Sequence, residues 1–237
     1  MRLILTFNFD HEKFTNKYRN FLMSFFKFAL VKEYQAEFNN YYNKPKIKPF
    51  SFSVYTKDLK HEKSYIISPS KELKMVFSSN DYNFINMIYN SLLINKKRKM
   101  SVAPNNKVFL KRLSLIYLEE IEKEQITIKM LSPLLIRDRD KKLNKDYYKT
   151  VEDKDFLEKL NFNLNYLANS FKLDTNNLYI EPLDVKKVVV PIMSVRYDAN
   201  DGIFTLRGKA ETLNTLYKIG IGSRRGEGFG LFEIVND

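Results

Sequence analysis

Hydrophobic residues recur along the chain with two different periods. Alternation of apolar and polar residues, typical of a strand with one buried face, begins at once (RLILTFNF, residues 2–9) and returns at residues 50–56, 73–77 and 108–117. Apolar residues three and four apart, typical of an amphipathic helix, occupy residues 13–38, behind a possible N-cap at Asp10, and residues 81–94. Short strands are also expected at residues 64–68 and 99–103. The order is β, α, β–β, α, β, which is that of a ferredoxin-like domain.

The same order returns after an acidic run at residues 119–124 (EEIEKE). Strands are predicted at residues 125–131, 178–181, 185–197, 203–209 and 231–235, and helices at residues 153–171 and 210–219. We therefore predict an α+β fold with two ferredoxin-like (RRM-like) βαββαβ domains in tandem, at residues 1–118 and 124–237.

Composition limits the function. The 237 residues are 44% hydrophobic, enough for a buried core, and 40 Lys and Arg against 28 Asp and Glu give a net charge of +12. Such a charge indicates a polyanionic partner, either nucleic acid or an anionic membrane. No apolar stretch is as long as a membrane span and the N-terminus lacks a signal-peptide layout, so we expect a cytoplasmic protein that does not insert into membranes. Without cysteine, and with only His11 and His61, no metal site or cofactor is expected.

The C-terminal segment GIGSRRGEGFGLFEI concentrates glycine. Five of the chain's seven glycines lie there, and the candidates for RNA binding in it are Gly220, Gly222, Gly226, Gly228, Arg224 and Arg225. Glycine lets backbone amides approach a partner closely, and arginine forks match phosphate geometry. A flexible tail is the alternative, but the segment ends in a strand-like run, LFEIV. It is not a P-loop, because it lacks the GK[ST] ending and opens no helix.

Residues 137–149 (RDRDKKLNKDYYK) form a second basic segment, with acidic residues interleaved. We interpret it as a charged loop. It is either simply solvated or, as a loop or hairpin, grips an RNA stem, and Arg137 and Arg139 are its candidate RNA-binding residues.

Three features together resemble one family. They are the glycine-rich ending, the segment LSPLLIR at residues 131–137, and the tandem ferredoxin-like pattern in a basic chain. The whole chain resembles the Cas6 family of CRISPR-associated endoribonucleases, members of the RAMP superfamily. The resemblance implies metal-independent cleavage of repeat transcripts into guide RNAs, by attack of a 2′-hydroxyl that leaves a 2′,3′-cyclic phosphate and a 5′-hydroxyl. It implies repeat RNA as the ligand, as a single strand or small stem-loop, and leaves open binding to interference-complex subunits and homodimerisation.

The resemblance also suggests catalytic positions. Many members place a histidine just after the first helix, with a nearby lysine and often a tyrosine. Here the histidine position falls on Tyr41 or Tyr42, the lysine position on Lys48, and the tyrosine position on Lys27. Lys44 and Lys46 of the same loop are expected to bind RNA. Tyrosine and lysine both have ordinary pKa values of about 10, so a site without histidine should be slow.

Each of these residues has a simpler interpretation. Lys27 could extend from the flank of an apolar helix face, and the tyrosines could pack the loop or stack on a base. Lys48 could bind phosphate without a catalytic part. His11 and His61 are interpreted as surface residues. Among functions, a non-cutting RNA-binding subunit is the main alternative. A general RNA-binding protein is less favoured, because the central strands lack the aromatic RNP motif.

Overall fold

The computed structural model describes residues 1–15, 18–36, 39, 47–57, 60–62, 65–96, 98–103, 105–192 and 195–235. By its internal contacts the chain divides into two compact units. The first comprises Met1–Lys48 and Val54–Leu118, and the second comprises Pro49–Ser53 and Glu119–Asp237. Among the described residues, no helix is long and apolar enough to cross a membrane.

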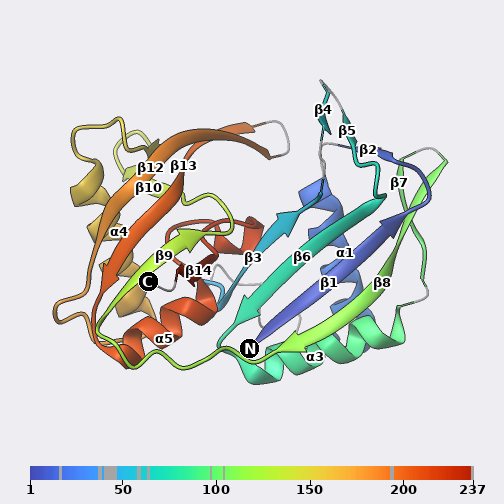
Figure 1. Cartoon of the computed structure of the whole chain (residues 1–237), viewed down its shortest axis with the longest axis horizontal. Helices are drawn as coiled ribbons and strands as arrows, with labels where there is room; N and C mark the ends of the chain where they lie inside the picture. The colour runs from blue at the N-terminus through green and yellow to red at the C-terminus, as the bar shows by residue number, and fades with distance from the viewer. Residues whose placement is uncertain are drawn as a thin grey trace. The chain divides into compact units, whose positions relative to one another are not determined.

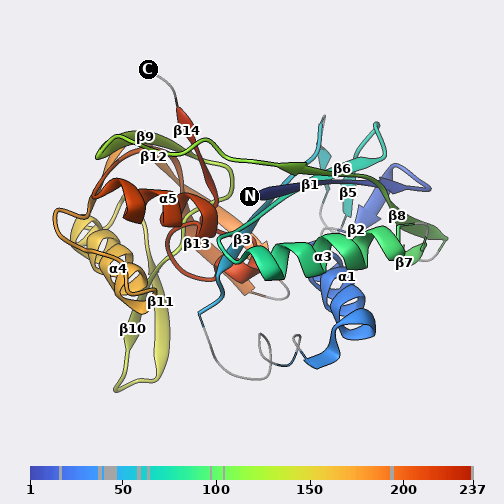
Figure 2. The ribbon, with the colours of Figure 1, turned by 90° about the horizontal axis from the view of Figure 1, so that it is seen from below.

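The first unit is built on a five-stranded sheet in the order β3-β6-β1-β8-β7. Its strands are β1 (Arg2–Phe9), β3 (Phe50–Tyr55), β6 (Glu72–Ser79), β7 (Met100–Ala103) and β8 (Asn106–Ile116). Two helices, α1 (Tyr18–Glu33) and α3 (Tyr82–Ile94), lie on one face of the sheet (Figure 2). Without β7, the strand order is that of a ferredoxin-like domain.

Phenylalanines fill the space between this sheet and its helices. Phe7 of β1 meets Phe25 of α1 edge-on with ring centroids 5.2 Å apart, and Phe26 stacks on Phe77 of β6 at 5.3 Å. Leu3, Leu5 and Phe7 of β1 are fully buried, as the alternating pattern predicts. Asp81 caps α3 because its carboxylate accepts a hydrogen bond from the backbone N–H of Phe84 at 3.0 Å.

Residues 13–15 correct the prediction that the first helical segment begins at Lys13. They form β2 (Lys13–Thr15) of a small sheet with β5 (Tyr65–Ile67) and β4 (Lys60–His61), in the order β2-β5-β4. Asp10 is not a helix cap; its carboxylate pairs with Lys99 at 3.0 Å. The helical pattern failed here because Phe14 is buried by strand pairing and by stacking on Phe9, with centroids 4.3 Å apart.

The second unit repeats the ferredoxin-like order with a four-stranded sheet, β12-β13-β9-β14 (Figure 1). Its elements are β9 (Gln125–Met130), β10 (Ile136–Asp140), β11 (Lys145–Lys149), α4 (Phe156–Ser170), β12 (Tyr179–Ile192), β13 (Val195–Arg207), α5 (Ala210–Ile219) and β14 (Phe232–Val235). Helices α4 and α5 cover one face of the sheet, and β10 and β11 pair as a separate antiparallel hairpin. The predicted tandem ferredoxin-like fold is thereby confirmed.

Two boundaries in this unit differ from prediction. The strands expected at residues 178–181 and 185–197 are a single strand, β12, with an irregularity between Pro182 and Asp184 and an end at Ile192. The strand contains Pro182 and Pro191, which are tolerated because β12 is an edge strand, where a missing N–H costs little. The charged segment at 137–149 is a hairpin because its two strands pair in full register from Ile136↔Lys149 to Asp140↔Lys145.

Candidate RNA-binding site

The glycine-rich segment is a tightly bonded loop between α5 and β14. The LSP segment lies against it: the Gly230 N–H donates to the carbonyl of Pro133 at 2.9 Å, and the Leu231 N–H donates to Ser132 Oγ at 3.0 Å. Another bond runs from the Ser223 N–H to the carbonyl of Leu135 at 2.8 Å. The LSP segment and the glycine-rich loop, which are far apart in the sequence, therefore form one structure.

The glycines of this loop serve its own packing. Gly222 and Gly230 have φ values of +75° and +72°, which L side chains rarely adopt. A Cβ on Gly222 would lie 2.5 Å from Leu134 Cδ1, and a Cβ on Gly230 would lie 1.8 Å from the carbonyl oxygen of Ile221. Gly220 caps α5 by donating to the carbonyl of Leu216 at 2.7 Å, and Gly228 donates to the carbonyl of Arg225 at 3.1 Å. These four glycines therefore hold the loop together, and the RNA contacts predicted for Gly220, Gly222 and Gly228 stay predictions.

Arg225 is buried inside the loop, with 5% of its surface exposed. Its Nε donates to the carbonyl of Ile219 at 3.1 Å and its Nη1 to the carbonyl of Gly222 at 2.9 Å. Burial lowers the pKa of Arg225 to about 10, so the guanidinium remains charged at neutral pH. The structure thus places Arg225 as a residue that holds the loop, not as a surface cation.

Arg224, in contrast to Arg225, lies at the surface, with 32% of its side chain exposed. Its backbone is left-handed, at φ +52°, and its Nε donates to the Tyr148 hydroxyl at 2.7 Å. Its Nη1 donates to both carboxylate oxygens of Glu227, at 2.9 and 3.2 Å. Burial lowers the pKa of Arg224, but the bonds to Tyr148 and Glu227 raise it by more, so it lies above its ordinary value.

Aromatic rings support this guanidinium. Its central carbon lies 4.9 Å from the ring centroid of Tyr197 and 5.8 Å from that of Tyr148. Tyr148 meets Tyr197 edge-on at 5.1 Å, and Tyr197 packs on Phe229 at 6.2 Å. The rings belong to a small second core, separate from the main one under α4 and α5, and they fix the plane in which Arg224 lies.

The hairpin presents two more arginines on the same side as Tyr148. Arg137 stands opposite Tyr148 in the register and Arg139 opposite Asp146, so these side chains share one face. Arg139 pairs with Asp146 at 3.0 Å and Arg137 at 3.8 Å, while 44% and 43% of their side chains stay exposed. We call Arg137, Arg139 and Arg224 the arginine face. Arg137 and Arg139 are two residues apart on a strand, hence roughly 6.6 Å apart along it.

The other face of the hairpin is tied to helix α4. Lys149 pairs with Asp155 at 2.9 Å, and Lys159 pairs with Asp138 at 3.2 Å. Asn163 of α4 joins all three elements: its Oδ1 accepts from the Arg137 N–H and from Ser223 Oγ, each at 3.2 Å. These contacts fix the hairpin to α4 and to the glycine-rich loop, and the side chains of Arg137 and Arg139 lie on the hairpin's opposite face.

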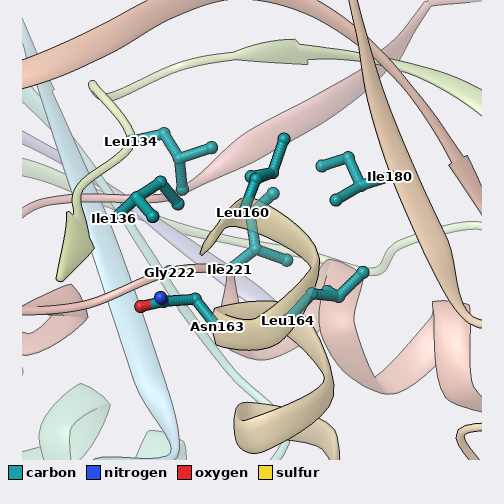
Figure 3. Close-up of a pocket in the computed structure, with 8 residues that line it drawn as sticks. All are labelled: Leu134, Ile136, Leu160, Asn163, Leu164, Ile180, Ile221 and Gly222. Carbon is teal, nitrogen blue, oxygen red and sulfur yellow. The ribbon is translucent and has the colours of Figure 1, made fainter. Parts of the chain in front are cut away.

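Beneath these elements lies a narrow apolar gap, shown in Figure 3. It is too small for a water molecule, and it is lined by Leu134, Ile136, Leu160, Asn163, Leu164, Ile180, Ile221 and Gly222. The gap shows where the loop packs on the core of the second unit, and it offers no room for a ligand.

The sequence of the second unit matches a known protein family. The C-terminal domain of CRISPR associated protein Cas6 matches residues 116–234, half of the chain, including the hairpin and the glycine-rich loop. The chain belongs to the Cas6 family. No curated protein sequence matches it.

Solved structures share this fold over the whole chain. A chain titled "An RAMP protein binding different RNA substrates" is 17% identical with a TM-score of 0.82, and each chain is covered fully. A Cas6-related protein from Pyrococcus furiosus is 16% identical with a TM-score of 0.83, covering 100% of this chain and 99% of its own. A chain titled "CRISPR associated protein Cas6" is 19% identical at 0.76, with coverage of 100% and 99%. At such identities these likenesses show the fold.

The catalytic positions expected for a Cas6 protein are only partly described. Lys27 is exposed on α1, next to the buried Phe26, and Lys48 is half-buried just before β3. Tyr41, Tyr42, Lys44 and Lys46 lie outside the described residues. Among the histidines, His11 is exposed in a bend ahead of β2, not at a helix start, and His61 is in strand β4. The catalytic assignments therefore stay predictions.

Sequence reasoning missed Tyr148, Glu227 and Asn163. Tyr148 could have been found, because in a hairpin of residues 136–149 it stands opposite Arg137. Glu227 and Asn163 are ordinary polar residues in the sequence, and only the fold brings them to Arg224 and Ser223.

Proposed function

We propose that this Cas6 family protein binds CRISPR repeat transcripts and cuts them into guide RNAs. The family match across the second unit, which contains the arginine face, is the observation that carries the proposal. The net charge of +12 supports a polyanionic ligand. Among solved structures of similar fold, one is titled as an RAMP protein binding different RNA substrates, and two are titled as Cas6 product complexes.

The proposed reaction uses a nucleophile that belongs to the RNA. The 2′-oxygen forms a bond to the adjacent phosphorus, the bond from phosphorus to the 5′-oxygen breaks, and the products end in a 2′,3′-cyclic phosphate and a 5′-hydroxyl. A group on the protein accepts the 2′-hydroxyl proton and another donates a proton to the leaving oxygen. The protein also orients the scissile bond and stabilises the added negative charge with cations. This route requires no metal ion.

We assign these tasks to the segment around residues 41–48 and to α1. Lys48 and Lys27 supply positive charge and a proton for the leaving oxygen, and Tyr41 or Tyr42 orients the 2′-hydroxyl. Lys44 and Lys46 bind the backbone nearby. The arginine face of the second unit binds the RNA backbone, and its phosphate contacts fix the register of the substrate.

Incubation with repeat RNA in EDTA tests the reaction. We expect cleavage at one position within the repeat, and no cleavage when the nucleotide that carries the nucleophile is replaced by its 2′-deoxy form. Cleavage of the 2′-deoxy RNA at that same position would exclude the proposed nucleophile.

Single-turnover rates test the residues. Lys48→Ala, Lys27→Ala and Tyr42→Phe should each slow cleavage at least about tenfold, the loss of one contribution to acid–base or electrostatic catalysis. Lys32→Ala is the matched control, because Lys32 is an exposed lysine of the same helix and pairs with Glu33. Wild-type rates in all three variants would place the active site elsewhere.

A non-cutting RNA-binding subunit is the second candidate. It is favoured by the sequence of residues 39–49, which contains no histidine. It predicts tight binding of the repeat with no product after long incubation at high protein concentration. Binding to interference-complex subunits and homodimerisation stay predictions. Sedimentation of the protein with and without RNA tests homodimerisation.

A further inference from the structure

We infer that Arg224 and Tyr148 together form a binding site for one backbone phosphate of the RNA, with Glu227 holding the guanidinium in place. The inference rests on the proposed function and adds to it a named ligand group and a second donor. Two chain segments supply the site, since Tyr148 lies on β11 of the hairpin and Arg224 lies in the glycine-rich loop.

Two of the three guanidinium nitrogens of Arg224 donate hydrogen bonds to protein groups, and the third is left for a ligand. Nε is bonded to Tyr148 and Nη1 to Glu227. No contact among the described residues engages Nη2, which shares the outer edge of the guanidinium with Nε. A planar guanidinium with one nitrogen still available, on a side chain that is 32% exposed, is suited to a phosphate oxygen.

Tyr148 adds a hydroxyl at the same point. Its oxygen accepts from Arg224 Nε at 2.7 Å and therefore keeps its own hydrogen for donation. Nε and Nη2 share one edge of the guanidinium, and the Tyr148 hydroxyl at this edge can rotate its hydrogen outward, so both groups can donate to oxygens of a single phosphate. Phosphate binding should cost little side-chain entropy, because Tyr197, Tyr148 and Glu227 already hold the Arg224 side chain in place.

The neighbouring arginines favour an RNA strand over an isolated anion. Arg137 stands directly opposite Tyr148 in the hairpin, and Arg139 follows two residues along β10. Cations spaced along one face in this way match successive phosphates of a strand. The site at Arg224 and Tyr148 is therefore one end of a backbone-binding row.

Repeat-RNA affinities, measured across a range of salt concentrations, test the inference. Arg224→Ala should weaken binding at least about tenfold and lower the salt slope by about 0.7, the value for one phosphate of a single strand. Tyr148→Phe should weaken binding about fivefold with the salt slope unchanged, because a neutral hydroxyl releases no counterion. In the Arg224→Ala background the same Tyr148→Phe change should cost less than about twofold, because the two donors share one phosphate.

Two further variants keep the result interpretable. Tyr147→Phe is the control, since Tyr147 is 41% exposed and lies on the other face of the hairpin; it should bind like wild type. Arg224→Lys keeps the charge and loses the fork, so affinity should fall while the salt slope stays. Thermal unfolding verifies that each variant is folded.

The outcomes separate this inference from the proposed function. Unchanged affinity in Arg224→Ala would overturn this inference, whereas repeat RNA that does not bind the wild-type protein would overturn the proposed function. A weakened Arg224→Ala together with a wild-type Tyr148→Phe would overturn the shared phosphate alone. So would an equal cost of Tyr148→Phe in both backgrounds, or a salt slope that falls in Tyr148→Phe as it does in Arg224→Ala.

Discussion

At the scale of single residues, Arg225 uses its charge inside the glycine-rich loop, whereas Arg224 keeps part of its guanidinium at the surface. The backbone at Arg224 is left-handed, at φ +52°, and the short 3-10 helix that begins at Arg225 follows it. Nothing in the letters SRRGEG indicates which arginine is buried. We expect the two residues to act differently, Arg225 through the shape of the loop and Arg224 through contact with RNA.

Arg225→Ala should destabilise the second unit by about 3 kcal/mol, because the carbonyls of Ile219 and Gly222 lose their buried donors. Chemical denaturation measures this change. Arg207→Ala serves as the control: Arg207 pairs with Glu181 at the surface, so its loss should cost less than about 1 kcal/mol. Equal stability of the two variants would show that Arg225 does not hold the loop.

Gly230→Ala should also destabilise the loop by about 3 kcal/mol or more, because its Cβ would overlap the carbonyl oxygen of Ile221 at a positive φ. Gly226 has no positive φ, so Gly226→Ala should change stability by about 0.5 kcal/mol or less. Thermal unfolding of the two variants is compared. A stable Gly230→Ala protein would mean that the loop does not have the geometry described above.

At the scale of elements, the hairpin β10–β11 shows where hydrophobic patterning stops being informative. Both of its strands are almost entirely charged or polar (IRDRD and KDYYK), so no apolar alternation distinguishes a strand from a solvated loop. Ion pairs to α4 and to Asp146 hold it instead. By contrast, α5 was predicted at its observed bounds because a buried apolar face and a terminal glycine mark it.

Removing both hairpin arginines tests whether the hairpin binds the repeat RNA. Arg137→Ala/Arg139→Ala should weaken repeat binding about 30-fold or more and lower the salt slope by about 1.4, for two phosphate contacts on a single strand. Lys141→Ala/Lys142→Ala removes the same charge from the turn between the strands and should have a small effect. If the two double variants weaken binding equally, net charge and not the arginine face determines affinity.

At the scale of the whole molecule, the sequence predicts the doubled ferredoxin-like architecture because each unit has enough periodic strands and helices to show its order. Of the small sheet, β5 was predicted as the strand at residues 64–68, whereas β2 was placed in a helix and the two-residue β4 was not predicted. The glycine-rich loop was placed between the last helix and the last strand, as observed, but its internal bonding was not foreseen. Packing between LSP and the glycines depends on contacts about 100 residues apart, such as Ser132 with Leu231.

The pH dependence of cleavage should reflect a site without histidine. An ordinary histidine titrates near pH 6.5, so a histidine acid or base would give an inflection there. We expect single-turnover rates to rise smoothly through pH 6–8, and His11→Ala and His61→Ala to match wild type. An inflection near pH 6.5 that disappears in either variant would assign catalysis to that histidine.

The end groups of the cleaved RNA test the central claim most directly. Repeat RNA is incubated with the protein in EDTA, and the fragments are weighed by mass spectrometry. We predict that the upstream fragment carries a 2′,3′-cyclic phosphate and the downstream fragment a 5′-hydroxyl. Fragments with a 5′-phosphate and a 3′-hydroxyl, or RNA that stays bound and uncut, would contradict the proposed cleavage.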